Sequence, residues 1–447
     1  MFASTPILRI SRRLLGAGLL LAGCAAHAAL PIQHWTRPDG SQVYFVESRA
    51  VPIVDAQIDF DAGSRREPAT LTGLAGATAR MLDKGVKAHG SEPALDEDAL
   101  DDAWADLGAQ FGAGAGNDRF SFSLRSLGDP VLLARAAALA ARQIGEPSFP
   151  EPVWSAERQR AIAALREAET RPGTRAGRLY AAAIFGDHPY GRRPTEASLQ
   201  AIGVGAMREF HARLQRCGAK VSIVGALDRA QADTLAAGLL DRLAQGACAP
   251  LPPVPEVRPL AAARDIREPF ASAQAHVYIG QPGIARSDPG YFPLTVGNYI
   301  LGGGGFVSRL TQQVREERGL SYSVYSDFSA NLGAGPFSIG LQTRPDQAAQ
   351  AVTVARQVLA GFVADGPTEA ELKAAQDNLI GGFPLRIDSN AKLVGNVANI
   401  AWYGLPLDYL DTWVDRVRAV GVADIRAAFA RVLQPDRMVT VVVGGAP

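Results

Sequence analysis

The feature that most constrains the fold is a repeated order of sequence patterns on the two sides of a proline-rich stretch. Residues 246–255 read G-A-C-A-P-L-P-P-V-P, and prolines at this density favour an extended linker. On each side the chain passes through a strand pattern, a helix after a Gly-containing turn, another strand, two helical blocks and a final strand. A repeated order of this kind indicates a duplication, so we expect two homologous domains.

The matching segments can be followed along both halves. In the first half they are residues 42–47, 54–60, 71–82, 119–124, 130–143, 153–169 and 220–224. In the second half they are residues 274–279, 292–300, 336–342, 345–362, 369–383 and 438–443. This order predicts an α+β fold in which helices cover one face of an antiparallel sheet. Because 447 residues are too many for one core, we place domains at 29–245 and 263–447, with a linker at 246–262.

Composition and charge limit the kinds of molecule that this chain is expected to bind. Hydrophobic residues make up 47% of the chain and charged residues 20%, which is typical of a globular protein. The 45 basic and 45 acidic side chains balance, and no basic tract stands out. Neutralising nucleic-acid phosphates requires such a tract or stripe. We therefore expect no nucleic-acid partner.

The first 28 residues are typical of an export signal. Arg9, Arg12 and Arg13 precede an apolar run at residues 14–22, which is too short to cross a bilayer as a helix of the mature protein. The adjacent arginines 12 and 13 also permit twin-arginine export. We therefore expect an exported protein of the bacterial periplasm.

Two processing routes are open after export. Residues 21–24, L-A-G-C, resemble a bacterial lipobox, which would make Cys24 the lipidated first residue of a membrane-anchored protein. Residues 26–28, A-H-A, resemble an ordinary signal-peptidase site, which would release a chain that starts at Ala29. The membrane is therefore expected as a partner only through a lipid anchor at Cys24.

Two cysteines follow the signal, Cys217 and Cys248. An oxidising periplasm permits them to form a disulfide, which would join the region before the strand pattern 220–224 to the region after the helical pattern 230–243. The alternative is a pair of separate buried thiols. Neither cysteine has a histidine near it in the sequence, which argues against a zinc site or a catalytic thiol.

One segment matches most of a metal-binding motif but lacks the side chains that would bind the metal. Residues 72–85 read T-G-L-A-G-A-T-A-R-M-L-D-K-G, which resembles the T-G-L-A-H-x-x-E-H-M-L-x-K-G segment of the pitrilysin/insulinase family of zinc peptidases. In that motif two histidines on one helical face bind zinc, and the glutamate activates water. The three positions are Gly76, Ala79 and Arg80 here. Glycine and alanine carry no donor, and a guanidinium repels a cation.

The resemblance also locates a third lost ligand. In the family a zinc-binding glutamate lies in a downstream helix with the pattern E-R-x-x-V-x-x-E-L. Residues 157–165 read E-R-Q-R-A-I-A-A-L, so Glu157 matches the first glutamate and the ligand position falls on Ala164. None of the six histidines has another three or four residues away, and His188 in the G-D-H-P-Y-G loop is interpreted as structural. We expect no metal bound by this chain.

A second motif contains an arginine and a tyrosine that can donate hydrogen bonds. Residues 301–325 read L-G-G-G-G-F-V-S-R-L-T-Q-Q-V-R-E-E-R-G-L-S-Y-S-V-Y, which resembles the R-E-x-x-G-L-x-Y segment of the same family. The resemblance implies that Arg315 and Tyr322 project into the catalytic chamber and contact the substrate backbone and the developing oxyanion. An arginine and a phenol are suitable donors for that task. The structural alternative is a helix ended by Gly319, followed by a half-buried strand tyrosine.

A third candidate is an edge strand. Residues 112–117, G-A-G-A-G-N, precede the alternating pattern at 119–124. Small residues let another backbone approach closely, and an open sheet edge can add a peptide as an extra strand. The segment is therefore interpreted either as a peptide-binding edge or as a flexible loop.

The resemblance implies a fold of two facing half-bowls around a chamber and a role as the non-catalytic subunit of a paired peptidase. In two-subunit members of the family one chain supplies H-x-x-E-H with its zinc, and the other supplies the Arg/Tyr pair. We therefore expect a chain that is inactive alone, a partner subunit bearing H-x-x-E-H, and peptide substrates. The alternative is a peptide-binding or scaffold protein on a peptidase fold. A third alternative, an enzyme with a relocated metal site, is disfavoured by the histidine spacing.

Overall fold

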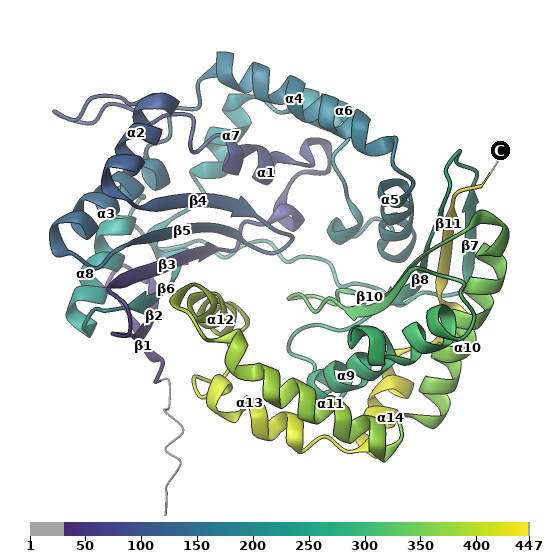
Figure 1. Cartoon of the computed structure of the whole chain (residues 1–447). Coiled ribbons are helices and arrows are strands. Elements are labelled where there is room, and N and C mark those ends of the chain that lie inside the picture. Colours follow the sequence, from purple (N-terminus) through teal and green to yellow (C-terminus); the bar gives the residue numbers. More distant parts are fainter. Residues whose placement is uncertain (1–30, 446–447) are drawn as a thin grey trace, which may run out of the picture.

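The computed structural model describes residues 31–445, so the expected signal and the lipidation candidate Cys24 lie outside the described residues. Two β-sheets form the centre of the two halves (Figure 1). In spatial order the first sheet contains β1 Gln33–Thr36, β2 Gln42–Glu47, β6 Lys220–Gly225, β3 Ile53–Phe60, β5 Phe120–Leu127 and β4 Gln110–Ala115. The second contains β7 Arg264–Glu268, β11 Val439–Val443, β8 Ala275–Pro282, β10 Pro336–Thr343 and β9 Ser323–Phe328.

The two sheets share one topology. The order β2-β6-β3-β5-β4 in the first sheet matches β7-β11-β8-β10-β9 in the second. In each sheet the last strand of this shared order in sequence, β6 or β11, runs parallel to the earliest, β2 or β7, and β1 is an additional edge strand of the first sheet. The remaining pairs are antiparallel. The α+β class and the duplication are confirmed, and each predominantly antiparallel sheet gains one parallel pair that alternation in the sequence cannot reveal.

Most helices occupy matching positions in the two halves, and five of them separate the last two strands of each half. The first half contains α1 Leu74–Arg80, α2 Glu97–Leu107, α3 Pro130–Gly145, α4 Glu151–Glu169, α5 Pro172–Phe185, α6 Glu196–Ala201, α7 Val204–His211 and α8 Arg229–Leu240. The second half contains α9 Tyr291–Asn298, α10 Ala348–Asp365, α11 Glu369–Gly382, α12 Asn390–Tyr403, α13 Tyr409–Arg418 and α14 Val422–Val432. Within residues 31–445 no helix has both the length and the apolarity needed to cross a membrane.

Each sheet buries an apolar face against helices of its own half. On β3 the alternate residues Val54, Ala56, Ile58 and Phe60 belong to the first core together with residues of α3 and α8. On β8 the alternate residues from Ala275 to Ile279 belong to a second core together with residues of α10. The period of two in the sequence therefore places these residues as expected.

The two halves exchange one helix each. Helix α12 of the second half packs on β3 and β6 of the first sheet, and α5 of the first half packs on β8 and β11 of the second (Figure 1). The Asn390 side chain donates from Nδ2 to the Ile53 carbonyl at 3.0 Å and accepts from Ser48 Oγ at 2.8 Å. The Tyr180 hydroxyl of α5 donates to the Phe337 carbonyl at 2.5 Å. Each sheet is thus covered on its second face by a helix from the other half.

A buried hydrogen-bond network also joins the halves, and it includes the G-D-H-P-Y-G loop. The Tyr190 hydroxyl donates to Asp118 Oδ1 at 2.5 Å and accepts from the Gly333 N–H at 3.1 Å. His188 Nδ1 accepts from the Tyr190 N–H at 3.1 Å, and its Nε2 lies 2.9 Å from the Pro255 carbonyl of the linker. Burial lowers the pKa of His188. The loop therefore has a structural role, as the sequence indicated.

The structure contains a disulfide between Cys217 and Cys248, whose Cα atoms are 5.8 Å apart. It joins the segment before β6 to the segment after α8 and closes a sequence separation of 31 residues. Gly40 lies against it, because a Cβ at that glycine would approach the Cys217 Cβ to 3.0 Å. The bond therefore fixes the start of the linker to the first sheet.

Candidate functional site

The short helix α1 carries three of the positions at which the family motif places zinc chemistry. It begins after Gly73, whose φ is +105°, and the Glu67 carboxylate accepts the N–H groups of Gly73 and Ala75 at 2.8 and 2.5 Å. Burial raises the pKa of Glu67. The helix is therefore well anchored, although it offers no metal ligand.

The side chains at those three positions do not fit a zinc ion. A Cβ at Gly76 would meet open space, Ala79 is buried, and Arg80 is exposed. Zinc needs imidazole, thiolate or carboxylate donors, and none of the three positions supplies one. No catalytic step can therefore be assigned to a metal held at this helix.

The third ligand position is equally empty of donors. Ala164 is an exposed residue of α4. Glu157 of the same helix forms an ion pair with Arg160 at 2.5 Å, one turn away. The retained glutamate is thus neutralised within its own helix and is not directed at a metal.

The structure brings Arg315 and Tyr322 into contact. Arg315 lies in the helical turn Thr311–Glu316, and Tyr322 precedes β9 by one residue. The guanidinium carbon lies 5.0 Å from the centroid of the Tyr322 ring and 4.7 Å from that of Phe306. Two rings within about 6 Å of a guanidinium stabilise its charge through their faces. The two residues predicted to act together therefore form one cluster with a third, Phe306.

Much of the hydrogen-bonding capacity of this cluster is free. Arg315 Nε pairs with Glu316 Oε1 at 3.2 Å, and within residues 31–445 neither Nη atom of Arg315 nor the Tyr322 hydroxyl has a hydrogen-bond partner. Tyr322 is 78% exposed, so it is not the half-buried strand residue of the structural alternative. Gly319 does end the helix, with a φ of +61° and its N–H on the Arg315 carbonyl at 2.9 Å.

A cavity of about 770 Å³ lies beside the cluster. Hydroxyl-bearing, amide and carboxylate side chains form much of its wall. Its lining residues include Asn298, Gly302, Phe306, Thr311, Arg315, Tyr322, Ser323, Tyr325, Ser326, Asp327 and Ser338. Burial raises the pKa of Tyr325 to about 12, so this phenol remains a neutral donor near pH 7. The cavity can therefore accept a ligand with both carbonyl and side-chain groups.

The glycines of the L-G-G-G-G-F segment allow the cavity wall to pack closely. A Cβ at Gly302 would lie 2.5 Å from the backbone N of Ser326 in β9. The Asn298 side chain donates from Nδ2 to the Ser326 carbonyl at 3.0 Å and accepts from its hydroxyl at 2.8 Å. The glycines therefore let this segment pack closely against β9. It also places Phe306, which the sequence showed beside the glycines but did not mark as functional.

Residues 112–115 lie at a sheet edge, and peptide binding at that edge stays a prediction. They belong to β4, which is the terminal strand of the first sheet, and Gly112 pairs with Ser123 of β5. The following turn is held by main-chain contacts, because the Ser64 N–H donates to the Gly116 carbonyl at 2.9 Å. The segment is therefore an ordered sheet edge, against which α1 also packs.

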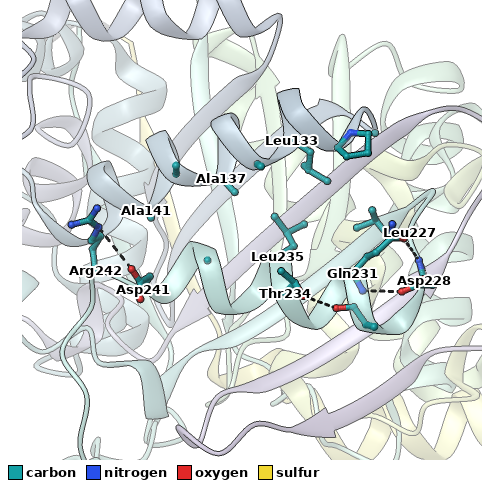
Figure 2. A pocket seen from close by; sticks show the side chains of 16 residues that line it. Leu133, Ala137, Ala141, Leu227, Asp228, Gln231, Thr234, Leu235, Asp241 and Arg242 are labelled. Atoms are coloured by element: carbon teal, nitrogen blue, oxygen red, sulfur yellow. Dashed lines mark hydrogen bonds and ion pairs between the residues drawn. The ribbon is translucent and has the colours of Figure 1, made fainter. Parts of the chain in front are cut away.

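A second cavity, of about 560 Å³, lies between α3 and α8 (Figure 2). Figure 2 shows Leu133 and Ala137 of α3 on one side and Leu235 of α8 on the other. Its polar rim is already paired: Asp228 and Gln231 cap one another, and Arg242 contacts Glu92 at 3.1 Å. Each polar side chain that lines this groove in the described chain has a neighbour as partner, so the cavity beside Arg315, with its free donors, is the stronger candidate.

Comparison with known proteins agrees with the motifs. The peptidase M16 inactive domain matches residues 202–379. A structure of a peptidase M16 inactive domain from Pseudomonas fluorescens is 33% identical, covers 94% of this chain and 98% of that chain, and superposes with a TM-score of 0.87. An uncharacterized zinc protease of Streptomyces coelicolor is 27% identical over 91% of this chain and 88% of its own length.

A larger protein shares the fold. The periplasmic protease PqqL of Escherichia coli superposes with a TM-score of 0.78 at 16% identity, and the alignment covers 92% of this chain and 45% of PqqL. At that identity the likeness concerns the fold alone. Taken with the two sheets of matching topology, the degenerate α1 and the Pseudomonas fluorescens structure, these findings show that the chain belongs to the M16 family of pitrilysin/insulinase-like zinc peptidases and is similar to its inactive members.

Proposed function

We propose that this chain is the non-catalytic subunit of a heterodimeric zinc peptidase in the bacterial periplasm. The observation that carries the proposal is the contrast between two sites in one molecule. The positions Gly76, Ala79 and Arg80 offer no metal donor, whereas Arg315 and Tyr322 stand together with free donors at a cavity. A chain with only the second site needs the first from another subunit.

The chemistry of the pair suits a peptide in the course of cleavage. A guanidinium presents a planar fork of N–H donors, and a phenol adds a neutral O–H donor. The Arg315 guanidinium carbon lies over both rings, and its Nη groups donate in the plane of the guanidinium. Donors aimed at a carbonyl oxygen that gains negative charge stabilise the transition state. In this proposal the metal and the general base belong to a partner bearing H-x-x-E-H.

Two of the comparisons are consistent with this proposed role. The inactive-domain structure from Pseudomonas fluorescens covers nearly the whole chain, which is consistent with a subunit that lacks zinc chemistry. PqqL is named a periplasmic protease, and this chain aligns with slightly less than half of it. A second chain of similar size would supply the missing half of such an assembly, and its interface would be large because two half-chambers must seal.

The proposal is tested by native purification of the chain from its own cell envelope. The expected result is co-purification of a protein of similar size bearing H-x-x-E-H, together with chelator-sensitive cleavage of a quenched peptide library. Recovery of the chain alone, inert and free of metal, would contradict it and favour the peptide-binding or scaffold alternative. Mass analysis of the mature N-terminus in the same sample distinguishes lipidated Cys24 from a chain that starts at Ala29.

A further inference from the structure

Three of the most exposed apolar side chains gather at one place on the molecule. Phe306, Val307 and Tyr322 are 69%, 74% and 78% exposed, the highest fractions among the large hydrophobic residues of the described chain. Single exposed apolar residues are ordinary, but a group of them marks a binding surface. Phe306 and Tyr322 also flank Arg315 and line the 770 Å³ cavity, whereas Val307 does not line it.

We infer that Phe306 forms an apolar subsite that selects peptides with a bulky hydrophobic side chain next to the carbonyl bound by Arg315 and Tyr322. The inference rests on the proposed peptide-binding role of that pair. It adds a substrate preference and a residue that sets it. The occupant is an extended peptide because the site is concave and places polar donors beside an apolar ring, which matches a backbone carbonyl followed by a side chain.

The geometry of the stack gives Phe306 its role. One face of the ring is engaged by the guanidinium, whose carbon is 4.7 Å from the ring centroid. The ring is nevertheless 69% exposed, so apolar surface remains for a ligand. A carbonyl held at the edge of the guanidinium brings the adjoining side chain of the peptide to the exposed part of this ring. An aromatic or leucine side chain gains from that contact, and a serine side chain does not.

The backbone around Phe306 holds the ring at the cavity. Gly305 adopts a φ of +62°, and the Ser308 N–H and Oγ donate to the Gly305 carbonyl at 3.0 and 2.7 Å. Ser308 itself is fully buried. The turn Gly305–Val307 is therefore held by hydrogen bonds to Ser308, and of its two large side chains only Phe306 lines the cavity.

Peptide binding to the isolated full chain tests this inference directly. The probes are fluorescein-labelled Gly-Ser octapeptides that carry one phenylalanine, leucine or serine at each position in turn, with binding followed by anisotropy. For the best position we expect about tenfold tighter binding of the phenylalanine peptide than of the serine peptide, within the range that apolar pockets give for side-chain discrimination. In Phe306→Ala that preference falls to less than about twofold.

Two variants serve as controls in the same assay. Val307→Ala removes an equally exposed neighbour outside the cavity lining and should leave the preference intact. Arg315→Ala should weaken phenylalanine and serine peptides alike, because it removes the carbonyl contact. Far-ultraviolet circular dichroism and unfolding curves establish that each variant is folded.

Each remaining outcome counts against the subsite. A preference that persists in Phe306→Ala overturns it, as does the absence of peptide binding by the wild-type chain. Equal loss of subunit association in Phe306→Ala and Val307→Ala, with the peptide preference unchanged, would assign the patch to the partner interface instead. Because binding is measured on the isolated chain, a confirmed preference in a chain that never assembles with an active partner would refute the proposed function and leave the subsite standing.

Discussion

At the scale of single residues, Arg315 differs from other arginines of the chain in how its donors are used. Arg309, six residues earlier, binds Glu371 through Nε and Nη2 at 2.6 and 2.7 Å. Arg315 commits only Nε, to its neighbour Glu316, and is held by two aromatic rings. Aromatic contacts fix a guanidinium without consuming its N–H groups. Because of this difference, we assign Arg315 to ligand binding and Arg309 to stabilising the fold.

Replacing Tyr322 with phenylalanine separates the ring from the hydroxyl. Tyr322→Phe keeps the contact with Arg315 and removes the free O–H donor, so the chain should fold and assemble normally. We expect about a tenfold loss of kcat/KM for the assembled peptidase, less than the 10²–10³ typical of a buried oxyanion donor, because this phenol is exposed. Steady-state kinetics on a quenched peptide check it, and an unchanged kcat/KM would remove the hydroxyl from the mechanism.

The lowered pKa of Glu371 predicts that the free energy of unfolding depends on pH. Hydrogen bonds from Arg309 lower its pKa to about 2 from 4.5, and Thr368 contributes further. A carboxylate whose pKa is lower in the folded state stabilises the fold above its unfolded pKa and loses that effect as the pH falls towards 2. Because the side chain is 31% exposed, solvent screening reduces the effect to about 1 kcal/mol.

Glu371→Gln should therefore lower the unfolding free energy by about 1 kcal/mol at pH 7, with the difference shrinking between pH 4.5 and pH 2. Urea titrations at several pH values measure it. Asp377→Asn is the matched control, since Asp377 of the same helix pairs with Lys373 at the surface and should change stability by less than about 0.5 kcal/mol at any pH. Equal effects of the two variants would show that Arg309 does not stabilise Glu371 specifically.

At the scale of elements, the exchange of α5 and α12 makes each sheet depend on the other half. The buried face of α12 contributes Leu393 and Val397 to a core that also contains Val46 and Val224 of the first sheet. The Lys220 ammonium donates to the Ala401 carbonyl at 2.6 Å, near the end of α12, and burial lowers its pKa. The halves are therefore expected to unfold together.

Asn390 tests that dependence, because its side chain links α12 to the first sheet. Removing a buried amide leaves the Ile53 carbonyl and the Ser48 hydroxyl with unmet hydrogen bonds, so Asn390→Ala should cost about 2 kcal/mol of unfolding free energy in one cooperative transition. Asn396→Ala is the control on the same helix, since Asn396 bonds only to nearby carbonyls at the surface. Chemical denaturation followed by two probes measures both, and separate transitions for the halves would contradict the coupling.

The sequence predicted the elements better than their connections. Val54 to Phe60 alternate and were recognised as a strand, but β7 was missed because Arg264, Asp265 and Arg267 leave only Ile266 to show an apolar face. The exchange of α5 and α12 was not predicted, since a helix pattern marks a buried face without naming the sheet that buries it. For the site, the resemblance of the R-E-x-x-G-L-x-Y segment indicated Arg315 and Tyr322, whereas Phe306 required the three-dimensional stack.

At the scale of the whole molecule, the duplication gives two corresponding regions, one without metal donors and one with free hydrogen-bond donors. Two copies of one topology give two helix-and-edge-strand regions, α1 beside β4 and the Gly302 segment beside β9. The first has lost its metal donors at Gly76, Ala79 and Arg80. The second keeps free donors at Arg315 and Tyr322. This contrast between the two regions supports the proposed role as a non-catalytic subunit.

The measurement that tests this claim most directly is the activity of the purified complex containing Arg315→Ala. We expect kcat to fall by a factor of at least about 10² while the complex stays intact and its zinc content is unchanged. Arg318→Ala is the matched control, because Arg318 contacts only Gln313 and Glu317 at the surface, and it should retain full activity. Full activity of the Arg315→Ala complex would show that this chain contributes no catalytic donor in trans, and would contradict the proposed function.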